Sequence, residues 1–429
     1  MKEKSTLQKL KERIKIAFEV RLCHFIDKQV ISSINYSTNK NTLLIIRLDA
    51  IGDYILFRNF LEEIAKDETY KTYKRTLVGN QMWKSLFEAW DKNTVDNVIW
   101  VDRKEFYHNP VYRYTIQKYI RQQGFEMATE STYSRLLLFG DAIAKVSGAK
   151  KRIGNEGNTD NLIEKEKKLA DSFYTKLLKT PNQPIFEFDR NKLFFEEFLN
   201  RKLTLVFPSL TDKINIQEKK SNQIALFIGA SEEYKTWHYE NFATLILKLH
   251  SINNELHFVL IGGKNEQSIA EKIISFLEVN KNNSETQSKN FSLSDTSSTS
   301  PLSVSPPTTI INLTGKTNLI QLTEKIAESN LLITNETVAS HLGAATETNT
   351  ICIANGRHIG RFSPYPKEYN LPISYIFPPK IEEELKQNSK EEVYEKYCNS
   401  MGMDINEVSV ERVAREVEKY VKGNYNKKL

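Results

Sequence analysis

The sequence predicts an α/β protein built from two doubly wound domains in series. From Thr42 onward, short apolar runs that end in polar residues or glycine alternate with segments of helical spacing, and the alternation starts again near Gln223. Strands and helices that alternate in this way form parallel sheets with helices on their faces. The chain has 429 residues, 40% of them hydrophobic, which is more than one ordinary core accommodates.

Residues 1–40 are expected to form a basic amphipathic helix ahead of the first domain. This segment holds nine Lys and Arg against four Asp and Glu, while the remainder of the chain is close to neutral. Apolar residues recur at spacings of three and four: Leu7, Leu10, Ile14, Phe18, Leu22 and Phe25. We expect this stripe to pack on the first domain; the alternative is that residues 1–30 lie at an anionic membrane surface. The near-neutral body gives no sign of a nucleic-acid-binding surface.

The first domain is predicted over residues 41–215 and the second over residues 216–429. The first opens with the apolar run LLIIRL, which ends at Asp49 and Gly52 and is followed by a helical segment. In the second, Ser, Thr, Asn and Pro predominate over residues 280–309, which predicts a disordered insertion after a helix that ends at Leu277. In doubly wound domains, ligands bind at the carboxyl ends of the strands.

The cysteines and the apolar runs favour a cytoplasmic protein. Cys23, Cys352 and Cys398 have no paired spacing, so they predict neither disulfides nor a zinc site. No apolar run approaches the roughly 20 residues that cross a bilayer, and charged residues interrupt the N-terminal segment where a signal peptide would be apolar. No convincing metal-binding motif is found. We therefore expect neither a metal nor a cofactor.

The first candidate site is the motif RLDAIGDY, in which Asp53 follows Gly52 where the first strand meets the first helix. A carboxylate at this edge of the sheet can act as a general base toward a sugar hydroxyl. The alternative is an ordinary aspartate favoured at a helix start by the helix dipole. Asp49 competes for the same role.

The second candidate is GASEEYKTWHYENF, where Ser231 and Lys235 follow a strand that ends at Gly229. A lysine on such a loop can neutralise a diphosphate leaving group as its charge develops. The alternative is a solvated lysine, which is the usual state of lysine in proteins.

The third candidate is TNETVASHLGAA, in which Asn335 ends a strand and Thr337 starts a helix. Backbone N–H groups at a helix start bind anions, and Glu336 is suited to a hydroxyl of the same ligand. His341 follows on the helix, where a lone histidine is more often structural.

The fourth candidate is the loop IANGRHIGRF, which follows the next strand and should face the same region. Arg357 and Arg361 lie between and after two glycines, Gly356 and Gly360. Arginines in this position suit phosphates or an acidic sugar. The alternative is solvent-facing charge.

Together these segments resemble glycosyltransferase family 9, the lipopolysaccharide heptosyltransferase family. The resemblance runs from about Asn41 to Tyr365, interrupted by the Ser/Thr-rich insertion. Four blocks occur in the family's order: LLIIRLDAIGDYIL, GAKKRIG, LFIGASEEYKTWHYENFATL and NLTGKTNLIQLTEKIAESNLLITNETVASHLGAA. The resemblance implies a GT-B fold, in which two Rossmann-like domains face each other across a cleft.

The resemblance also implies roles for single residues. Asp53 falls where the family has its catalytic base, and Lys235, with Ser231 in the same loop, where it has a phosphate-binding lysine. The donor-holding segment is matched by Glu336, Thr337 and His341. Glu266 matches an acidic residue near the donor ribose more loosely.

The sequence departs from the family on the donor side. Glu336 stands where the family usually has Asp, and Val338 where it usually has Gly. Residues 355–361 replace a glycine-proline-threonine-aspartate loop. These departures put ADP-heptose as the donor in doubt, whereas the catalytic position is intact.

The predicted function is that of an inverting, metal-independent glycosyltransferase. It would move a heptose or related sugar from a nucleotide-diphosphate donor to a glycan or lipid-linked saccharide, such as lipopolysaccharide. One alternative is a non-catalytic nucleotide-sugar-binding protein that retains the fold, and another is a peripheral membrane scaffold. A nicotinamide-dependent oxidoreductase is disfavoured, because only Gly52 is present where G-x-G-x-x-G is needed.

Overall fold

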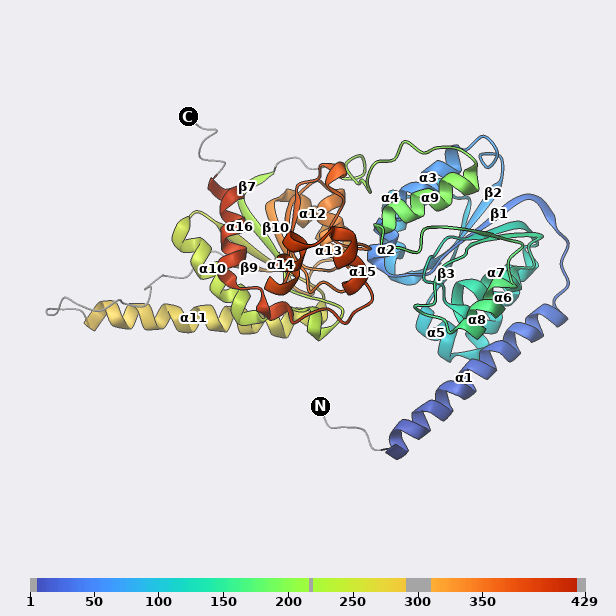
Figure 1. Cartoon of the computed structure of the whole chain (residues 1–429), viewed down its shortest axis with the longest axis horizontal. Helices are drawn as coiled ribbons and strands as arrows, with labels where there is room; N and C mark the ends of the chain where they lie inside the picture. Colours follow the sequence, from blue (N-terminus) through green and yellow to red (C-terminus); the bar gives the residue numbers. More distant parts are fainter. Residues whose placement is uncertain (1–5, 216–218, 291–309, 423–429) are drawn as a thin grey trace. The chain divides into compact units, whose positions relative to one another are not determined.

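A computed structural model describes residues 6–215, 219–290 and 310–422 of the chain (Figure 1). The chain divides into two compact units. The N-terminal unit comprises Met1–Asn182 and Glu187–Leu205, and the C-terminal unit comprises Gln183–Phe186 and Val206–Leu429. Each unit contains one six-stranded parallel sheet.

The N-terminal unit has its strands in the order β3-β2-β1-β4-β5-β6. Its strands are β1 (Asn39–Arg47), β2 (Lys74–Asn80), β3 (Asn97–Val101), β4 (Phe125–Glu130), β5 (Lys151–Asn155) and β6 (Lys176–Leu178). Its helices are α1 (Thr6–Ser33), α2 (Ile51–Ile55), α3 (Asn59–Lys66), α4 (Lys84–Trp90), α5 (Arg103–His108), α6 (Pro110–Gln122), α7 (Ala142–Ser147), α8 (Glu164–Asp171) and α9 (Glu187–Leu199). The predicted first strand is therefore central, and Leu43 to Ile46 are buried, as expected for a strand covered on both faces.

The C-terminal unit repeats this order, because its strands run β9-β8-β7-β10-β11-β12. Its strands are β7 (Lys220–Phe227), β8 (His257–Ile261), β9 (Ile310–Asn312), β10 (Ser329–Asn335), β11 (Asn349–Ile353) and β12 (Ile373–Ile376). Its helices are α10 (Tyr239–Ile252), α11 (Gln267–Asn290), α12 (Leu319–Glu328), α13 (Val338–Ala345), α14 (Pro379–Gln387), α15 (Lys390–Tyr397) and α16 (Val410–Lys422). The prediction of two doubly wound α/β domains is confirmed.

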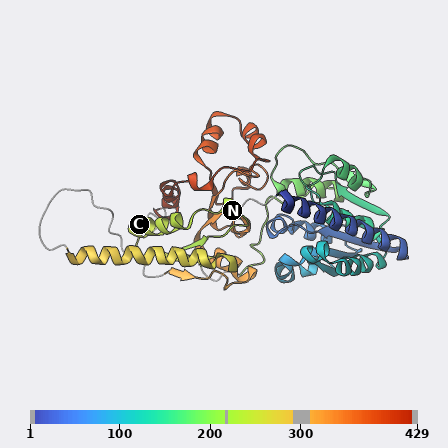
Figure 2. The same cartoon turned by 90° about the horizontal axis from the view of Figure 1, so that it is seen from below.

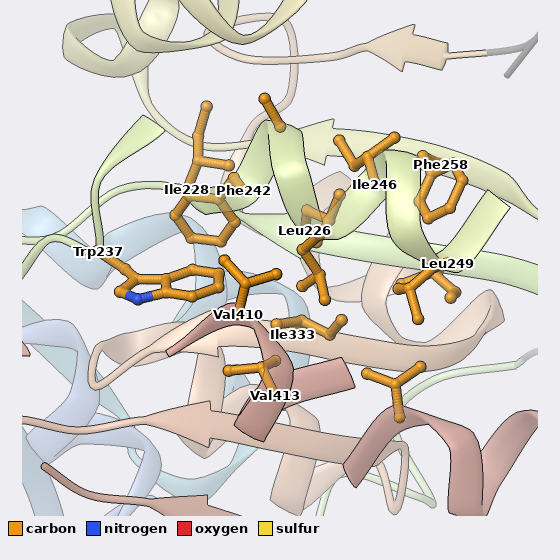
Figure 3. Close-up of a cluster of buried hydrophobic side chains, with 14 of the residues drawn as sticks. Leu226, Ile228, Trp237, Phe242, Ile246, Leu249, Phe258, Ile333, Val410 and Val413 are labelled. Carbon is orange, nitrogen blue, oxygen red and sulfur yellow. The ribbon is translucent and has the colours of Figure 1, made fainter. Parts of the chain in front are cut away.

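The core of the C-terminal unit joins α10 and α16 to the sheet (Figure 3). Trp237 is fully buried and meets Phe242 edge-on, with ring centroids 5.0 Å apart. Its indole Nε1 donates to Val408 O at 2.9 Å, immediately before α16. Because this indole is both packed and hydrogen-bonded, it fixes the end of the loop that contains Lys235.

The N-terminal helix forms, but the expectation of how it packs was wrong. Cys23, Ile26 and Val30 are buried against the unit, whereas Ile14, Phe18 and Phe25 of the predicted stripe are exposed by 58% or more. The stripe was identified by its spacing, but Cys23, Ile26 and Val30 on another side of the helix make the contact. None of the helices in the described part of the chain is both long and apolar enough to span a bilayer.

The predicted insertion also begins differently from our expectation. Helix α11 does not end at Leu277 but continues to Asn290, as one long helix in Figures 1 and 2. The backbone of residues 280–290 is therefore helical. The rest of the predicted insertion, residues 291–309, lies outside the described residues.

Candidate active site

Asp53 lies in the first turn of α2, which begins four residues after β1 ends. Ala50 is the N-cap residue, with extended backbone angles, so the chain turns directly from the carboxyl end of β1 into the helix. In a sheet with this strand order, ligands bind at the carboxyl edge of the sheet, next to the ends of the neighbouring strands β1 and β4. The structure therefore places Asp53 at this edge, where the sequence predicted it.

Arg47 links the two aspartates that compete for the role of base. Its Nε lies 2.8 Å from Asp49 Oδ1, and its guanidinium is fully buried. Burial lowers the pKa of Arg47, but the charges of Asp49 and then Asp53 outweigh it, so the pKa is raised overall. Asp49 is thus paired with an internal cation, which weakens its case as the base.

Side chains from β2 and the following turn fix the turn that precedes α2. Asn80 Nδ2 donates to Leu48 O at 3.1 Å and to Asp49 O at 3.0 Å. Trp83 Nε1 also donates to Asp49 O, at 3.2 Å, and its ring stacks on Tyr54 at 4.4 Å. Contacts therefore hold Asp49, before α2, and Tyr54, within α2, and Asp53 lies between these two residues in the sequence.

A second acidic side chain, Glu130, is buried at the same edge. It ends β4 opposite Ile46 of β1. Burial raises its pKa to about 8, Asp141 adds to the rise, and a hydrogen bond from the Thr132 side chain partly offsets it. The Thr132 backbone N–H also donates to Glu130 Oε1, at 3.2 Å. Glu130 Oε2 is buried and meets no hydrogen-bond donor among the described residues. Glu130 is therefore mainly protonated at neutral pH.

A cavity of about 750 Å³ opens beside this edge of the N-terminal unit. Ala50 and Asn80 line one part of it, and Arg103, Lys104 and His108 of α5 line another. The volume lies within the range of small-molecule sites, and three basic side chains in its wall favour an anionic or polyhydroxylated ligand.

In the C-terminal unit, Asn335 joins the carboxyl ends of β10 and β7. Its Nδ2 donates to Gly229 O at 3.0 Å, and its Oδ1 accepts from Trp237 N at 3.1 Å. Because one side chain bonds to both ends of the loop between Gly229 and Trp237, the predicted phosphate loop is fixed at its two ends. Within this loop Ser231 is exposed and Lys235 is half-buried.

Glu336 follows Asn335 and lies in the electrostatic field of Lys235. Burial raises the pKa of Glu336 to about 7, while a hydrogen bond from Ser363 Oγ and the charge of Lys235 lower it. Its Oε2 is buried and has no hydrogen-bond partner in the described part of the chain. The carboxyl group therefore retains acceptor capacity next to the lysine.

Thr337 is the N-cap residue of α13, and its Oγ1 accepts from Ala339 N at 3.2 Å. The predicted helix start is confirmed, although one of its N–H groups is already bonded by this hydroxyl. His341, one turn into the helix, is buried, and its Nδ1 lies 3.0 Å from Tyr365 Oη. Burial lowers the pKa of His341 to about 4, so it is a neutral, packed histidine.

The loop over residues 355–361 contacts the predicted phosphate loop through Arg357. Arg357 Nη1 donates to Tyr234 Oη, and its guanidinium lies 5.5 Å from the centre of the same ring. Gly356 and Gly360 both have positive φ, and a Cβ on Gly360 would lie 2.6 Å from the Tyr394 ring. Arg361 is 9% exposed, with its guanidinium 4.9 Å from the Phe362 ring centre.

Glu266 lies against the glycines that end β7 and β8. A Cβ on Gly229 would lie 2.7 Å from Glu266 Cδ, and one on Gly262 would lie 3.1 Å from Glu266 Cβ. A side chain on Gly229 would therefore displace the Glu266 side chain. The loosely aligned Glu266 is thus placed beside the start of the predicted phosphate loop.

Sequence reasoning missed the residues that support this site. Asn80 and Trp83 bond to Asp49 from positions that are 31 and 34 residues away, and Arg47 and Glu130 are buried charged groups. The available signal was position: Asn80 and Glu130 end strands that neighbour the central strand. The sequence of the loop over residues 355–361 gave no sign that Ser363, which follows it, would bond to Glu336.

Comparisons with known proteins agree with this fold. The model of glycosyltransferase family 9 (heptosyltransferase) matches residues 299–394. Solved structures that resemble the chain include three bacterial proteins. The glycosyltransferase family 9 protein of Veillonella parvula has a TM-score of 0.59 at 15% identity, covering 91% of this chain and 100% of that chain. E. coli ADP-heptose lps heptosyltransferase II has a TM-score of 0.57 at 14% identity, covering 90% of this chain and 99% of that chain. E. coli heptosyltransferase WaaC with ADP has a TM-score of 0.61 at 14% identity, covering 88% of this chain and 99% of that chain.

A search of curated proteins gives no match. The solved structures have low identity to this chain and establish the fold, which is the GT-B fold of two doubly wound domains. The family model adds a sequence match that begins before β9 and extends into α15, across the segment with Glu336, Thr337 and His341. The resemblance predicted from the sequence is confirmed: the chain is similar to glycosyltransferase family 9 (heptosyltransferase) in sequence over residues 299–394, and to solved structures of that family in fold over most of its length.

Proposed function

We propose that this protein is an inverting, metal-independent glycosyltransferase that uses a nucleotide-diphosphate sugar, with heptose or a related sugar as the transferred group. The observation that carries the proposal is the grouping of Lys235 and Glu336 at the carboxyl ends of β7 and β10, beside the start of α13. A cation, a hydroxyl-binding carboxyl group and a helix N-terminus at one sheet edge suit a sugar diphosphate.

In the proposed reaction, Asp53 takes the proton of an acceptor hydroxyl, and the hydroxyl oxygen forms a bond to the anomeric carbon. The bond from that carbon to the diphosphate oxygen breaks on the opposite face, so the configuration inverts. Lys235 and the N-terminus of α13 stabilise the charge on the departing diphosphate. Donor turnover needs no redox step, and the proton ends on Asp53.

The remaining donor residues would act in binding. Ser231 and Thr337 offer hydroxyl groups to phosphates, and Arg357 and Arg361 offer guanidinium groups. Glu266, held against Gly229, is suited to a ribose hydroxyl. His341 contributes by packing, because it is buried against Tyr365 and neutral.

Metal independence is part of the proposal because Lys235 and the start of α13 can neutralise a departing diphosphate. Among the residues that the structure describes, no group of three or more His, Cys, Asp or Glu side chains could hold a metal ion. Lys235 and the helix start would take over the neutralising role that Mg²⁺ has in metal-dependent transfer.

The acceptor we propose is a glycan or a lipid-linked saccharide such as lipopolysaccharide. The protein would work in the cytoplasm, at the inner face of the cytoplasmic membrane, with contact through residues 1–30. The basic side chains that line the cavity of the N-terminal unit support an acceptor with negative charge.

A thermal-shift screen against nucleotide-diphosphate sugars tests the donor class, because a ligand that binds only the folded state raises its melting temperature. The stabilising donor is then incubated with lipopolysaccharide acceptors, and release of the nucleoside diphosphate and glycosylation of the acceptor are both measured. We expect stabilisation and transfer. Stabilisation without transfer to any acceptor would favour the non-catalytic binding protein, and no stabilisation by any donor would refute the proposal.

A further inference from the structure

Helix α1 has two apolar faces that point in different directions. Cys23, Ile26 and Val30 are buried, whereas Ile14, Phe18 and Phe25 are 61%, 64% and 58% exposed. With about 100° of rotation per residue, the three exposed side chains lie within roughly 40° of one another and roughly 80–180° from the buried ones. We call Ile14, Phe18 and Phe25 the outer stripe.

The inner face is fixed to the N-terminal unit by buried polar contacts. Arg113 Nε and Nη2 donate to the two oxygens of Asp27 at 2.7 Å and 2.8 Å, and Gln117 Nε2 donates to the same carboxylate at 2.7 Å. Near the end of the helix, Arg121 donates to the carbonyl oxygens of Ile31 and Ile34, both at 2.9 Å. Rotating the outer stripe inward would break these contacts, so the stripe stays outside.

The N-terminal part of the helix extends beyond the surface that it covers. Ile14 to Phe18 are all exposed, although five consecutive residues go more than once around a helix. Figures 1 and 2 show α1 as one long helix at the surface of its unit. The outer stripe is therefore accessible to a large, flat partner.

The charges around the stripe indicate what that partner is. Lys11, Lys15, Arg21 and Lys28 are exposed on the same helix, and residues 1–40 hold nine basic against four acidic residues. A second copy of this helix would bring like charges together. An anionic bilayer complements both features, because apolar side chains enter it while Lys and Arg reach the headgroups.

We propose that the outer stripe of α1 inserts into the interface of a bilayer that contains anionic lipid, with Lys11, Lys15, Arg21 and Lys28 at the headgroups. This inference rests on the proposed function and specifies its membrane contact. The helix is a rigid docking element, since its inner face is locked to the unit.

The docking has a geometric consequence for the acceptor. Tyr107 and His108 line the cavity of the N-terminal unit and also contact α1. Cys23 Sγ lies 3.6 Å from Tyr107 O, and His108 Nδ1 lies 3.3 Å from Glu19 Oε1. These contacts are made by the inner face of α1, so a bilayer held by the outer stripe lies one helix diameter, ~10 Å, from the cavity residues of α5, and the saccharide of a lipid-linked acceptor has to reach across that distance.

The test uses the full chain and vesicles of phosphatidylcholine with or without phosphatidylglycerol, at low and high salt. The variant is Ile14→Gln/Phe18→Gln/Phe25→Gln, and the matched control is Val111→Gln/Tyr119→Gln, which changes two exposed apolar residues of α6 in the same unit. We expect the native chain to co-sediment with anionic vesicles only, and less at high salt. The triple variant should bind roughly tenfold or more weakly, with an unchanged melting temperature, and the control should bind normally.

Equal binding by native chain and triple variant, or no vesicle binding by either, would overturn the proposal. So would a native dimer in sedimentation analysis that the triple variant dissociates, which would identify the stripe's partner as a second copy. These readouts need no sugar donor, and they therefore separate a failure of this inference from a failure of the proposed transfer. Deleting residues 1–34 is the poorer test, because it removes the partner of Arg113 and destabilises the unit.

Discussion

The Nε of Arg47 lies 2.8 Å from Asp49 Oδ1, at the point where the central strand of the N-terminal unit ends. This ion pair gives the two aspartates of the RLDAIGDY motif different roles. Asp49 neutralises a fully buried guanidinium, while Asp53 stands in the first turn of the following helix. Asp49 is therefore assigned a structural role, and Asp53 the role of the proposed base.

Asp49→Asn should therefore lower stability. The substitution removes a counter-charge of Arg47, whose side chain is fully buried, and breaking a buried ion pair costs about 3 kcal/mol. Thermal and chemical denaturation of Asp49→Asn and Asp53→Asn should show the larger loss in Asp49→Asn. The reverse order would contradict this division of roles.

Lys235→Ala should weaken donor binding and slow transfer, because Lys235 acts on Glu336 within the grouped donor residues. Lys264→Ala is the matched control, since Lys264 is an exposed lysine in the same unit. Titration of each variant with the donor, followed by steady-state kinetics, measures both effects. If the two variants lose equal affinity, general surface charge is responsible instead of a placed contact.

Glu130→Gln should change how stability depends on pH. Burial raises the pKa of Glu130 from its ordinary value of 4.5 to about 8, so between these values the folded chain keeps a proton that the unfolded chain releases. The free energy of unfolding therefore falls as pH rises through this window, by an amount on the order of a few kcal/mol.

The glutamine variant lacks this titration and should lose less stability than the native chain between pH 5 and pH 9. Melting temperatures of both chains across this range measure the difference. Parallel pH profiles would show that Glu130 is ionised in the folded state, contrary to our assignment.

Transfer should survive chelation, because the proposed phosphate partners are Lys235 and the start of α13. The measurement is the initial rate with and without EDTA, using protein that has been dialysed against the chelator. A rate that is lost in EDTA and restored by Mg²⁺ or Mn²⁺ would require a different account of how the leaving group is stabilised.

The strand ends and helix starts of both sites could be predicted from the sequence, because local patterns determine them. The run LLIIRL predicted β1, and the polar residues after it predicted a turn at the carboxyl end of that strand. The same reasoning located Thr337 at the start of α13. Apolar periodicity and turn chemistry suffice for such features.

The supporting contacts could not be predicted, because they join residues that are far apart in the sequence. Asn335 bonds to Gly229, and Ser363 bonds to Glu336, only once the strands are in register. The prediction of how α1 packs was wrong for a related reason. The spacing of apolar residues defined the predicted stripe, whereas the buried Asp27–Arg113 pair selects the face that contacts the unit.

If Asp53 is the general base, replacing it with Asn should separate sugar transfer from donor binding and folding. Asp53→Asn keeps the size of the side chain and removes its basicity, so donor binding by thermal shift and the melting temperature should stay near those of the native chain. The rate of sugar transfer under saturating donor and acceptor should fall by ~10²–10⁴-fold, the usual contribution of a general base. A folded Asp53→Asn variant that binds donor and transfers sugar at a near-native rate would contradict the account.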